Sequence, residues 1–143
     1  MILRKPNFQD IYKATQVLSD DEEEQKQILQ EWLYQHKNNP SFFSYVIVKD
    51  HEVLAVVTGW FYEETTIVSI GRIEGNEKLK QTLFNKILKA FDPEKITVSL
   101  KELDKFASNF KVDSYNLVWD RLEKEDEVIE TDENSTSVEE RND

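Results

Sequence analysis

The chain has 143 residues, of which 38% are hydrophobic and 11% aromatic, and it contains no cysteine. That length fits one domain, and the absence of thiols excludes disulfides, a thiol nucleophile and thiolate metal ligands. The net charge of −11 falls mostly on residues 121–143, which hold ten acidic and three basic residues. Because nucleic-acid binders present a basic surface, the composition argues against nucleic acid as a partner.

The first part of the chain predicts a short strand followed by two helices. Residues 2–4 form the apolar strand, and apolar residues then recur at helical spacing over 8–18, with Asn7 as a suitable N-cap. A second helix is expected over 22–37, because its dipole favours the acidic residues in its first turn. Its expected apolar stripe comprises Ile28, Trp32 and Leu33.

Three strand signals come next. Residues 43–48, 53–62 and 65–73 are rich in β-branched and aromatic residues and are separated by short polar turns, which is the pattern of an antiparallel meander. The second of them ends in Trp60-Phe61-Tyr62. Since side chains alternate along a strand, at least one of these aromatic residues must lie on each face of the sheet. An exposed one would offer a contact surface for a protein partner.

The clearest amphipathic pattern predicts a helix over 76–91. Asn76 is its expected N-cap, and Asp92-Pro93 ends it. A strand follows over 95–100. Because a helix separates this strand from the one before it, the two strands are expected to be parallel neighbours.

The C-terminal part completes one domain and adds a tail. A short helix over 102–110 and a last strand over 115–120 complete a domain of residues 1–122. Residues 123–143 have few apolar residues to bury, so we expect an acidic disordered tail. With no signal peptide and no apolar run long enough for a membrane span, a cytoplasmic protein that does not bind membranes is expected.

The order β-α-α-β-β-β-α-β-α-β, with the opening Leu3-Arg4-Lys5-Pro6-Asn7-Phe8-Gln9-Asp10-Ile11, resembles the GNAT superfamily of N-acetyltransferases. Members often begin with an apolar-Arg strand and place an Asp at the start of the first helix. The resemblance covers residues 1–122. It implies an α/β fold with a mixed, mostly antiparallel sheet and flanking helices, and a splay between the fourth and fifth strands. It further implies N-acyl transfer with acetyl-CoA as the co-substrate.

The family's phosphate loop has the pattern Gln/Arg-x-x-Gly-x-Gly/Ala, in which backbone N–H groups and a helix N-terminus hold the pyrophosphate. Here the sequence reads Arg72-Ile73-Glu74-Gly75-Asn76-Glu77. The resemblance implies that Arg72, Gly75 and Asn76 bind the cofactor. Glu77 departs from the pattern, because it places a carboxylate beside the phosphates. The loop also has a purely structural interpretation, as a glycine-containing turn followed by the acidic first turn of a helix.

The catalytic residues are less clearly marked. The family commonly uses a Glu or a water relay as the base and a Tyr as the acid, but residues 102–110 contain no Tyr. Glu63 and Glu64 at the expected hairpin turn, and Glu74 after the strand, are candidate bases, and the amine would approach from the Glu63/Glu64 side. Ser108 is a weak substitute for the acid. Acidic residues in turns are also explained as solvated surface groups.

Two further points complete the sequence-based expectations. His36 and His51 lack partners at helical spacing, so no metal site is expected. The alternative to an enzyme is a non-enzymatic bacteriophage protein on the same scaffold, located in the virion or directed at the host. Such a protein would meet its partner through the aromatic strand Trp60–Tyr62 or the acidic tail.

Overall fold

The computed structural model describes residues 1–99, 111–113 and 116–120. Within these residues the chain alternates strands with helices in much the expected order. The elements are β1 (Ile2–Arg4), α1 (Phe8–Leu18), α2 (Glu22–Asn38), β2 (Phe42–Lys49), β3 (Glu52–Tyr62), β4 (Ile67–Glu74), α3 (Glu77–Phe91), β5 (Lys95–Ser99), β6 (Lys111–Asp113) and β7 (Asn116–Asp120).

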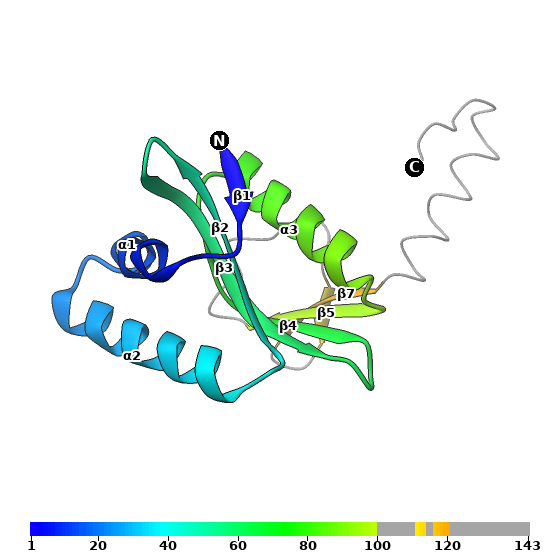
Figure 1. Cartoon of the computed structure of the whole chain (residues 1–143). Helices are drawn as coiled ribbons and strands as arrows, with labels where there is room; N and C mark the ends of the chain where they lie inside the picture. Colours follow the sequence, from blue (N-terminus) through cyan, green and yellow to red (C-terminus); the bar gives the residue numbers. More distant parts are fainter. Residues whose placement is uncertain (100–110, 114–115, 121–143) are drawn as a thin grey trace, which may run out of the picture.

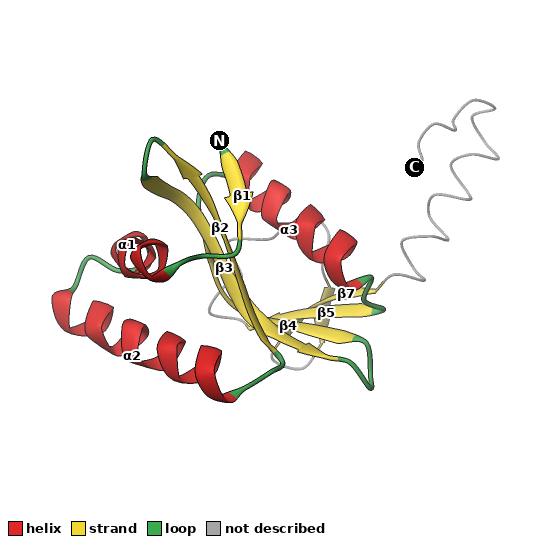
Figure 2. Ribbon diagram, in the orientation of Figure 1, coloured by secondary structure: helices red, strands yellow, loops and turns green. Residues whose placement is uncertain are grey.

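The strands form one sheet in the order β1-β2-β3-β4-β5-β7-β6. Helices α1 and α2 cover one face and α3 covers the other, which gives three layers (Figures 1 and 2). Among the described strands only β4 and β5 pair in parallel, and the other neighbouring strands pair antiparallel. The mixed, mostly antiparallel sheet and the parallel β4–α3–β5 crossover are therefore confirmed.

The C-terminal part differs from the expected order in one respect. The structure has an additional short strand, β6, paired with β7. The sequence did not indicate it, because three residues are too few to show a periodicity. The helix expected over 102–110 and the tail expected over 123–143 lie outside the described residues.

One half of the core lies between the sheet and the helices α1 and α2. Ile11 and Ala14 of α1 and Ile28 and Trp32 of α2 are buried against apolar residues of β2 and β3. The expectation that Leu33 shares this stripe was wrong, because its side chain is exposed. At 3.6 residues per turn Leu33 lies about 140° around the helix from Ile28, which directs it away from the sheet.

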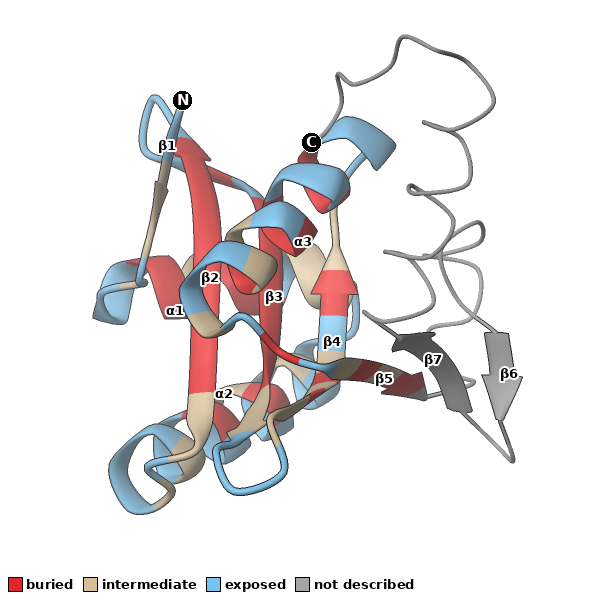
Figure 3. Ribbon diagram, turned by 90° about the vertical axis from the view of Figure 1, so that its right-hand side faces the viewer, coloured by how far each residue is buried: buried red, intermediate tan, exposed pale blue. Residues whose placement is uncertain are grey.

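The other half of the core lies beneath α3. Leu83 and Ile87 are fully buried against the central strands, whose buried stretches are red in Figure 3. The three consecutive aromatic residues divide as expected. The Phe61 ring stacks on that of Phe91 of α3, with centroids 4.8 Å apart. The Trp60 ring lies on the opposite face, and Tyr62 is exposed.

An ion pair joins the first strand to the first helix. Arg4 donates two hydrogen bonds to the Asp10 carboxylate, at 2.9 and 3.0 Å. Asp10 also accepts from the Asn7 amide at 3.2 Å, while the Asn7 side chain accepts from the Asp10 amide at 2.8 Å. This reciprocal capping box confirms Asn7 as the N-cap. Burial alone would raise the pKa of Asp10, but the Arg4 and Asn7 hydrogen bonds and the nearby charges outweigh burial and lower it.

The β4–α3 turn requires glycine. Gly75 has φ of +141°, and a Cβ there would lie 2.7 Å from the Cβ of Ala55. A side chain would therefore meet both an unfavourable backbone conformation and a buried neighbour. Asn76 then begins α3, and its side-chain oxygen accepts from the Leu79 amide at 2.8 Å. The expected cap at Asn76 is confirmed.

The Arg4–Asp10 ion pair predicts that part of the protein's folding stability is lost in acid. Asp10→Asn will lower the free energy of unfolding by about 2 kcal/mol at pH 7, because charge-assisted hydrogen bonds are lost. Since the folded pKa of Asp10 is depressed, this stability is fully present above the ordinary pKa of an aspartate side chain and is lost as the pH falls through the lower folded pKa. Urea unfolding between pH 7 and pH 2 will therefore show the two proteins converging in acid. Asp20→Asn, at an exposed position, is the control, and a difference that persists unchanged to pH 2 would contradict the assignment.

Gly75→Ala will destabilise the fold by about 2 kcal/mol, because the positive φ and the Ala55 contact both oppose a Cβ. Chemical denaturation of Gly75→Ala, Ala55→Gly and the double variant will separate the two effects. The double variant will recover the steric part and retain the backbone part. A Gly75→Ala protein within about 0.5 kcal/mol of the wild type would disprove the described turn.

Candidate functional site

The strand that leads into α3 contains a bulge. Between Thr58 and Gly59 of β3, the partner in β4 changes from Arg72 to Ile70, so Gly71 is an extra residue in β4. A Cβ at Gly71 would lie 2.8 Å from Cζ3 of Trp60. Glycine thus allows the bulge to form directly beneath the indole ring.

The described pairing of β4 with β5 ends beside this bulge. The parallel pairing joins Ile67–Ile70 to Lys95–Val98, and β5 is described as far as Ser99, which is paired with β7. A bulge bends and twists its strand. The splay expected between the fourth and fifth strands concerns the chain after Ser99, which lies outside the described residues.

The start of α3 follows directly after β4. Here the Glu77 carboxylate is exposed and forms an ion pair of 3.0 Å with Lys80, whose side chain is only 9% exposed. The partial positive charge of a helix N-terminus favours an anion at this place. Glu77 currently supplies that negative charge, and Lys80 supplies a cation within reach of the same position.

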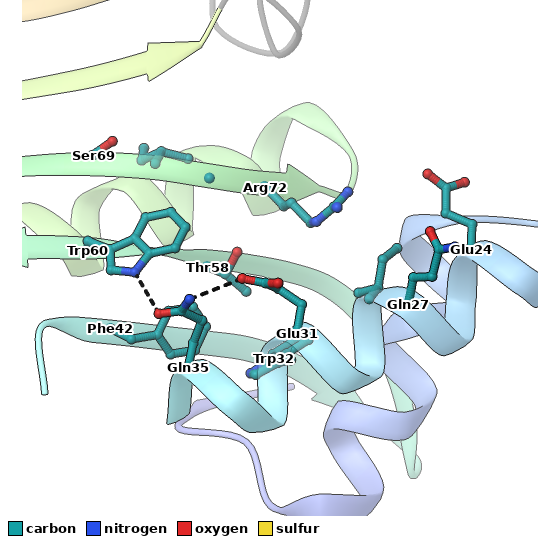
Figure 4. Close-up of a pocket in the computed structure, with 13 residues that line it drawn as sticks. Glu24, Gln27, Glu31, Trp32, Gln35, Phe42, Thr58, Trp60, Ser69 and Arg72 are labelled. Carbon is teal, nitrogen blue, oxygen red and sulfur yellow. Dashed lines mark hydrogen bonds between the residues drawn. The ribbon is translucent and has the colours of Figure 1, made fainter. Parts of the chain in front are cut away.

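A cavity of about 610 Å³ lies between α2 and the sheet, on the face opposite α3. It reaches the bulge, since both Gly71 and Arg72 line it. Figure 4 shows side chains of α2 and of the strands pointing toward one another across it. The lining residues are Glu24, Gln27, Ile28, Glu31, Trp32 and Gln35 of α2, Phe42 of β2, Thr58 and Trp60 of β3, and Ser69, Ile70, Gly71 and Arg72 of β4.

A chain of hydrogen bonds crosses this cavity. The Trp60 indole N–H donates to the side-chain oxygen of Gln35 at 3.2 Å. The Gln35 amide nitrogen donates in turn to Oε2 of Glu31 at 3.0 Å. Figure 4 shows both bonds. They connect the aromatic ring over the bulge to a carboxylate on α2.

The charges around the cavity are unbalanced. Glu24 and Glu31 contribute two carboxylates and Arg72 contributes one guanidinium. The cavity therefore favours a cationic ligand over an anionic one.

The structure separates the residues that the sequence singled out. Gly75 and Asn76 lie together at the β4–α3 turn, whereas the Arg72 side chain lies in the cavity on the other face of the sheet. Glu63 and Glu64 follow the end of β3, at the opposite end of β4 from Gly75. Glu63 lines a second cavity of about 470 Å³ there. Ser108 lies outside the described residues.

Sequence reasoning missed the polar residues of α2 that line the cavity. Glu24, Glu31 and Gln35 recur at intervals of seven and four residues, which places them on one face of the helix. This polar row runs beside the buried Ile28 and Trp32. A row of polar residues beside the buried stripe of a helix was the sequence signal that could have indicated a cavity here.

Neither a metal site nor a membrane span is found in the part of the chain that the structure describes. No group of three or more potential ligands is close enough to hold a metal ion there. Among the same residues, no helix combines the length and the apolar character needed to cross a bilayer.

Comparisons with known proteins were made at the level of sequence and of structure. The sequence matches no protein-family model and no curated protein. The structure resembles the PaiA N-acetyltransferase from Thermoplasma acidophilum in complex with coenzyme A, with a TM-score of 0.62 and 12% identity over 83% of this chain and 98% of that one.

Two other solved structures are similar. One is a chimera of spermidine N-acetyltransferase SpeG from Vibrio cholerae and hSSAT, with a TM-score of 0.61 and 9% identity over 88% of this chain and 99% of that one. The other is aminoglycoside 6'-acetyltransferase type Ii, with a TM-score of 0.56 and 15% identity over 73% and 75% of the two chains. At these identities the likeness concerns the fold, and this chain has the fold of the GNAT N-acetyltransferases.

Proposed function

We propose that the protein transfers an acyl group from acyl-coenzyme A to an amine bound in the cavity between α2 and β4. The observation that carries this proposal is the bulge at Gly71. It lies where the described pairing of β4 with β5 ends, and it lines the cavity. One strand segment thus adjoins both places that a two-substrate transfer needs. The similar PaiA N-acetyltransferase structure is a complex with coenzyme A, which supports coenzyme A as a ligand of this fold.

The residues present partly fit an acyl-CoA. The segment of β4 beyond the bulge would hold the pantetheine arm, and the start of α3, at Gly75 and Asn76, would hold the pyrophosphate. Acetyl-CoA would supply an activated thioester. The Glu77 carboxylate would repel the phosphates. Lys80, which forms an ion pair with Glu77, is a cation that can bind them instead. Lys80 can exchange the Glu77 carboxylate for a phosphate oxygen while Glu77 turns toward solvent.

The cavity fits the amine. Glu24 and Glu31 favour an ammonium group, and the Trp60 and Phe42 rings, packed edge to face with centroids 5.7 Å apart, offer an apolar wall. An aromatic face also attracts a cation. The amine would reach the thioester through the part of the cavity lined by Gly71.

Coenzyme A binding provides the test. Addition of CoA at about 100 times its Kd will stabilise the protein by about 2.7 kcal/mol, which a thermal shift assay detects. Glu77→Ala will bind CoA about tenfold more tightly than the wild type, because the carboxylate beside the phosphates is removed and Lys80 is released.

Glu63→Ala is the matched control. It removes an equal charge at the far end of β4, so its CoA affinity will equal that of the wild type. If neither the wild type nor Glu77→Ala is stabilised by millimolar CoA, acyl transfer from CoA is excluded. A non-enzymatic role for the scaffold would then be the better explanation.

A further inference from the structure

One edge of the sheet is only partly covered by a neighbouring strand. Strand β1 pairs with residues 46–48 of β2, although β2 begins four residues before that pairing. Figure 3 shows β1 beside the upper part of β2 only. The register that places Arg4 beside Val46 would place Pro6 beside Ser44. Because proline has no backbone N–H, it cannot donate to the Ser44 carbonyl, and the ladder ends.

The backbone groups at this free edge follow from the pairing on the other side of β2. The Phe61 amide donates to the Ser41 carbonyl at 2.9 Å, so the backbone of Ser41 faces β3. Since backbone direction alternates along a strand, Phe42 and Ser44 face the uncovered edge. The Phe42 amide already donates to the Asn39 carbonyl at 3.0 Å. The uncovered edge therefore presents the Phe42 carbonyl and both the N–H and the carbonyl of Ser44.

The unused backbone groups of Ser44 are unfavourable for the free protein. In the described part of the chain, neither β1 nor a neighbouring loop bonds to its backbone, and the residue is only 8% exposed. A buried backbone group that lacks a partner costs free energy comparable to a lost hydrogen bond. A strand that exchanged two hydrogen bonds with Ser44 would remove this cost.

The same edge borders the second cavity, of about 470 Å³, since four consecutive residues of β2 line it. Its wall on the α3 side consists of the rings of Phe43, Tyr45, Phe61 and Phe91. The Phe91 centroid lies 4.9 Å from that of Phe43 and 4.8 Å from that of Phe61. Phe61 and Phe91 are half-buried, so part of this aromatic surface is open. Unpaired backbone groups beside an open aromatic surface suit a peptide strand with apolar side chains.

Charged groups of opposite sign lie at the two ends of this cavity. Lys5 follows Arg4 and lines the cavity at its Tyr45 end, and the Lys86 ammonium lies 5.5 Å from the centroid of the Tyr45 ring. Glu63 lines the other end, after β3, whose last residues pair with the start of β2. An antiparallel strand added here would run from the Tyr45 end to the Glu63 end. An acidic residue before its apolar residues and a basic residue after them would complement these charges.

We propose that residues 42–45 of β2 bind an extended peptide segment of a partner protein, which adds one strand to the sheet in line with β1. The middle residue of the segment exchanges two hydrogen bonds with Ser44. Opposite residues of an antiparallel ladder point to the same face, so its two neighbours, beside Phe43 and Tyr45, point to the aromatic wall and are apolar. The segment has the pattern acidic, apolar, any residue, apolar, basic. Its binding is independent of the acyl transfer proposed above.

A peptide titration followed by NMR tests the proposal on the full chain. The probe is acetyl-Glu-Val-Thr-Val-Lys-amide, and acetyl-Val-Glu-Thr-Lys-Val-amide is the control of equal composition and charge. At about 10 mM probe, roughly ten times a millimolar Kd, the Ser44 amide signal will shift saturably and its hydrogen exchange will slow about tenfold. The control peptide will produce neither effect, because its charges would lie against the aromatic wall. A probe N-methylated at its threonine will bind about tenfold more weakly, since it cannot donate to the Ser44 carbonyl.

An exchange of charges tests the direction of the added strand. Lys5→Glu will bind the probe about tenfold more weakly than the wild type does, and it will bind the charge-exchanged peptide acetyl-Lys-Val-Thr-Val-Glu-amide about tenfold more tightly. Lys49→Glu, an exposed change at the other end of β2 and outside the cavity, will leave both affinities unchanged. Because Lys5 is exposed, circular dichroism will confirm that its variant is folded. Equal affinities of Lys5→Glu and the wild type for both peptides would contradict the proposed direction.

Three results would overturn the proposal as a whole. One is a Ser44 amide signal that does not respond to the probe, and another is equal affinity for the probe and for its N-methylated form. The third is slow hydrogen exchange of the Ser44 amide in the free protein, which would show that the chain itself or a second copy already covers the edge. The CoA titration has a separate readout, so its failure would refute acyl transfer and leave the peptide site intact.

Discussion

The extra residue at Gly71 in β4 is the constraint on which the site depends. It shifts the register of β4 against β3. The described pairing of β4 with β5 ends beside it, at Ile70 and Val98, while β5 is paired with β7 on its other edge. The bulge requires glycine because the Trp60 ring lies against it. A single position thus changes the register of the strand and contacts an aromatic ring that lines the cavity.

The electrostatics follow from this geometry. Trp60, fixed over the bulge, orients Gln35, and Gln35 orients the Glu31 carboxylate. On the other face, the start of α3 combines the positive end of a helix with the Glu77–Lys80 ion pair. The strand therefore separates an anion-favouring region at the β4–α3 turn from a cation-favouring cavity beneath α2. The proposed transfer from a phosphorylated carrier to an amine needs one site that favours an anion and another that favours a cation.

The sequence predicted the features that local chemistry determines. The caps at Asn7 and Asn76 and the parallel β4–β5 crossover follow from short-range patterns, and the structure confirms them. The sequence predicted fewer features of the candidate site. The expected strand over 65–73 includes Gly71, but the bulge there was not predicted, because the contact of Gly71 with Trp60 is visible only once β3 and β4 are paired. The candidate bases lie in turns near the motif. The cavity residue Glu31 is about forty residues before Arg72 in the chain and comes to the cavity only through the packing of α2 on the sheet.

The most direct test of this account is a measurement of the β4–β5 ladder in solution. Cross-strand nuclear Overhauser effects between backbone protons will connect Ile67–Ile70 with Lys95–Val98 and will end there. Effects that continue from Gly71 to Ser99 would show an unbroken ladder. An unbroken ladder would contradict the account in which β4 leaves β5 at the bulge. It would also contradict the proposed placement of coenzyme A and the amine.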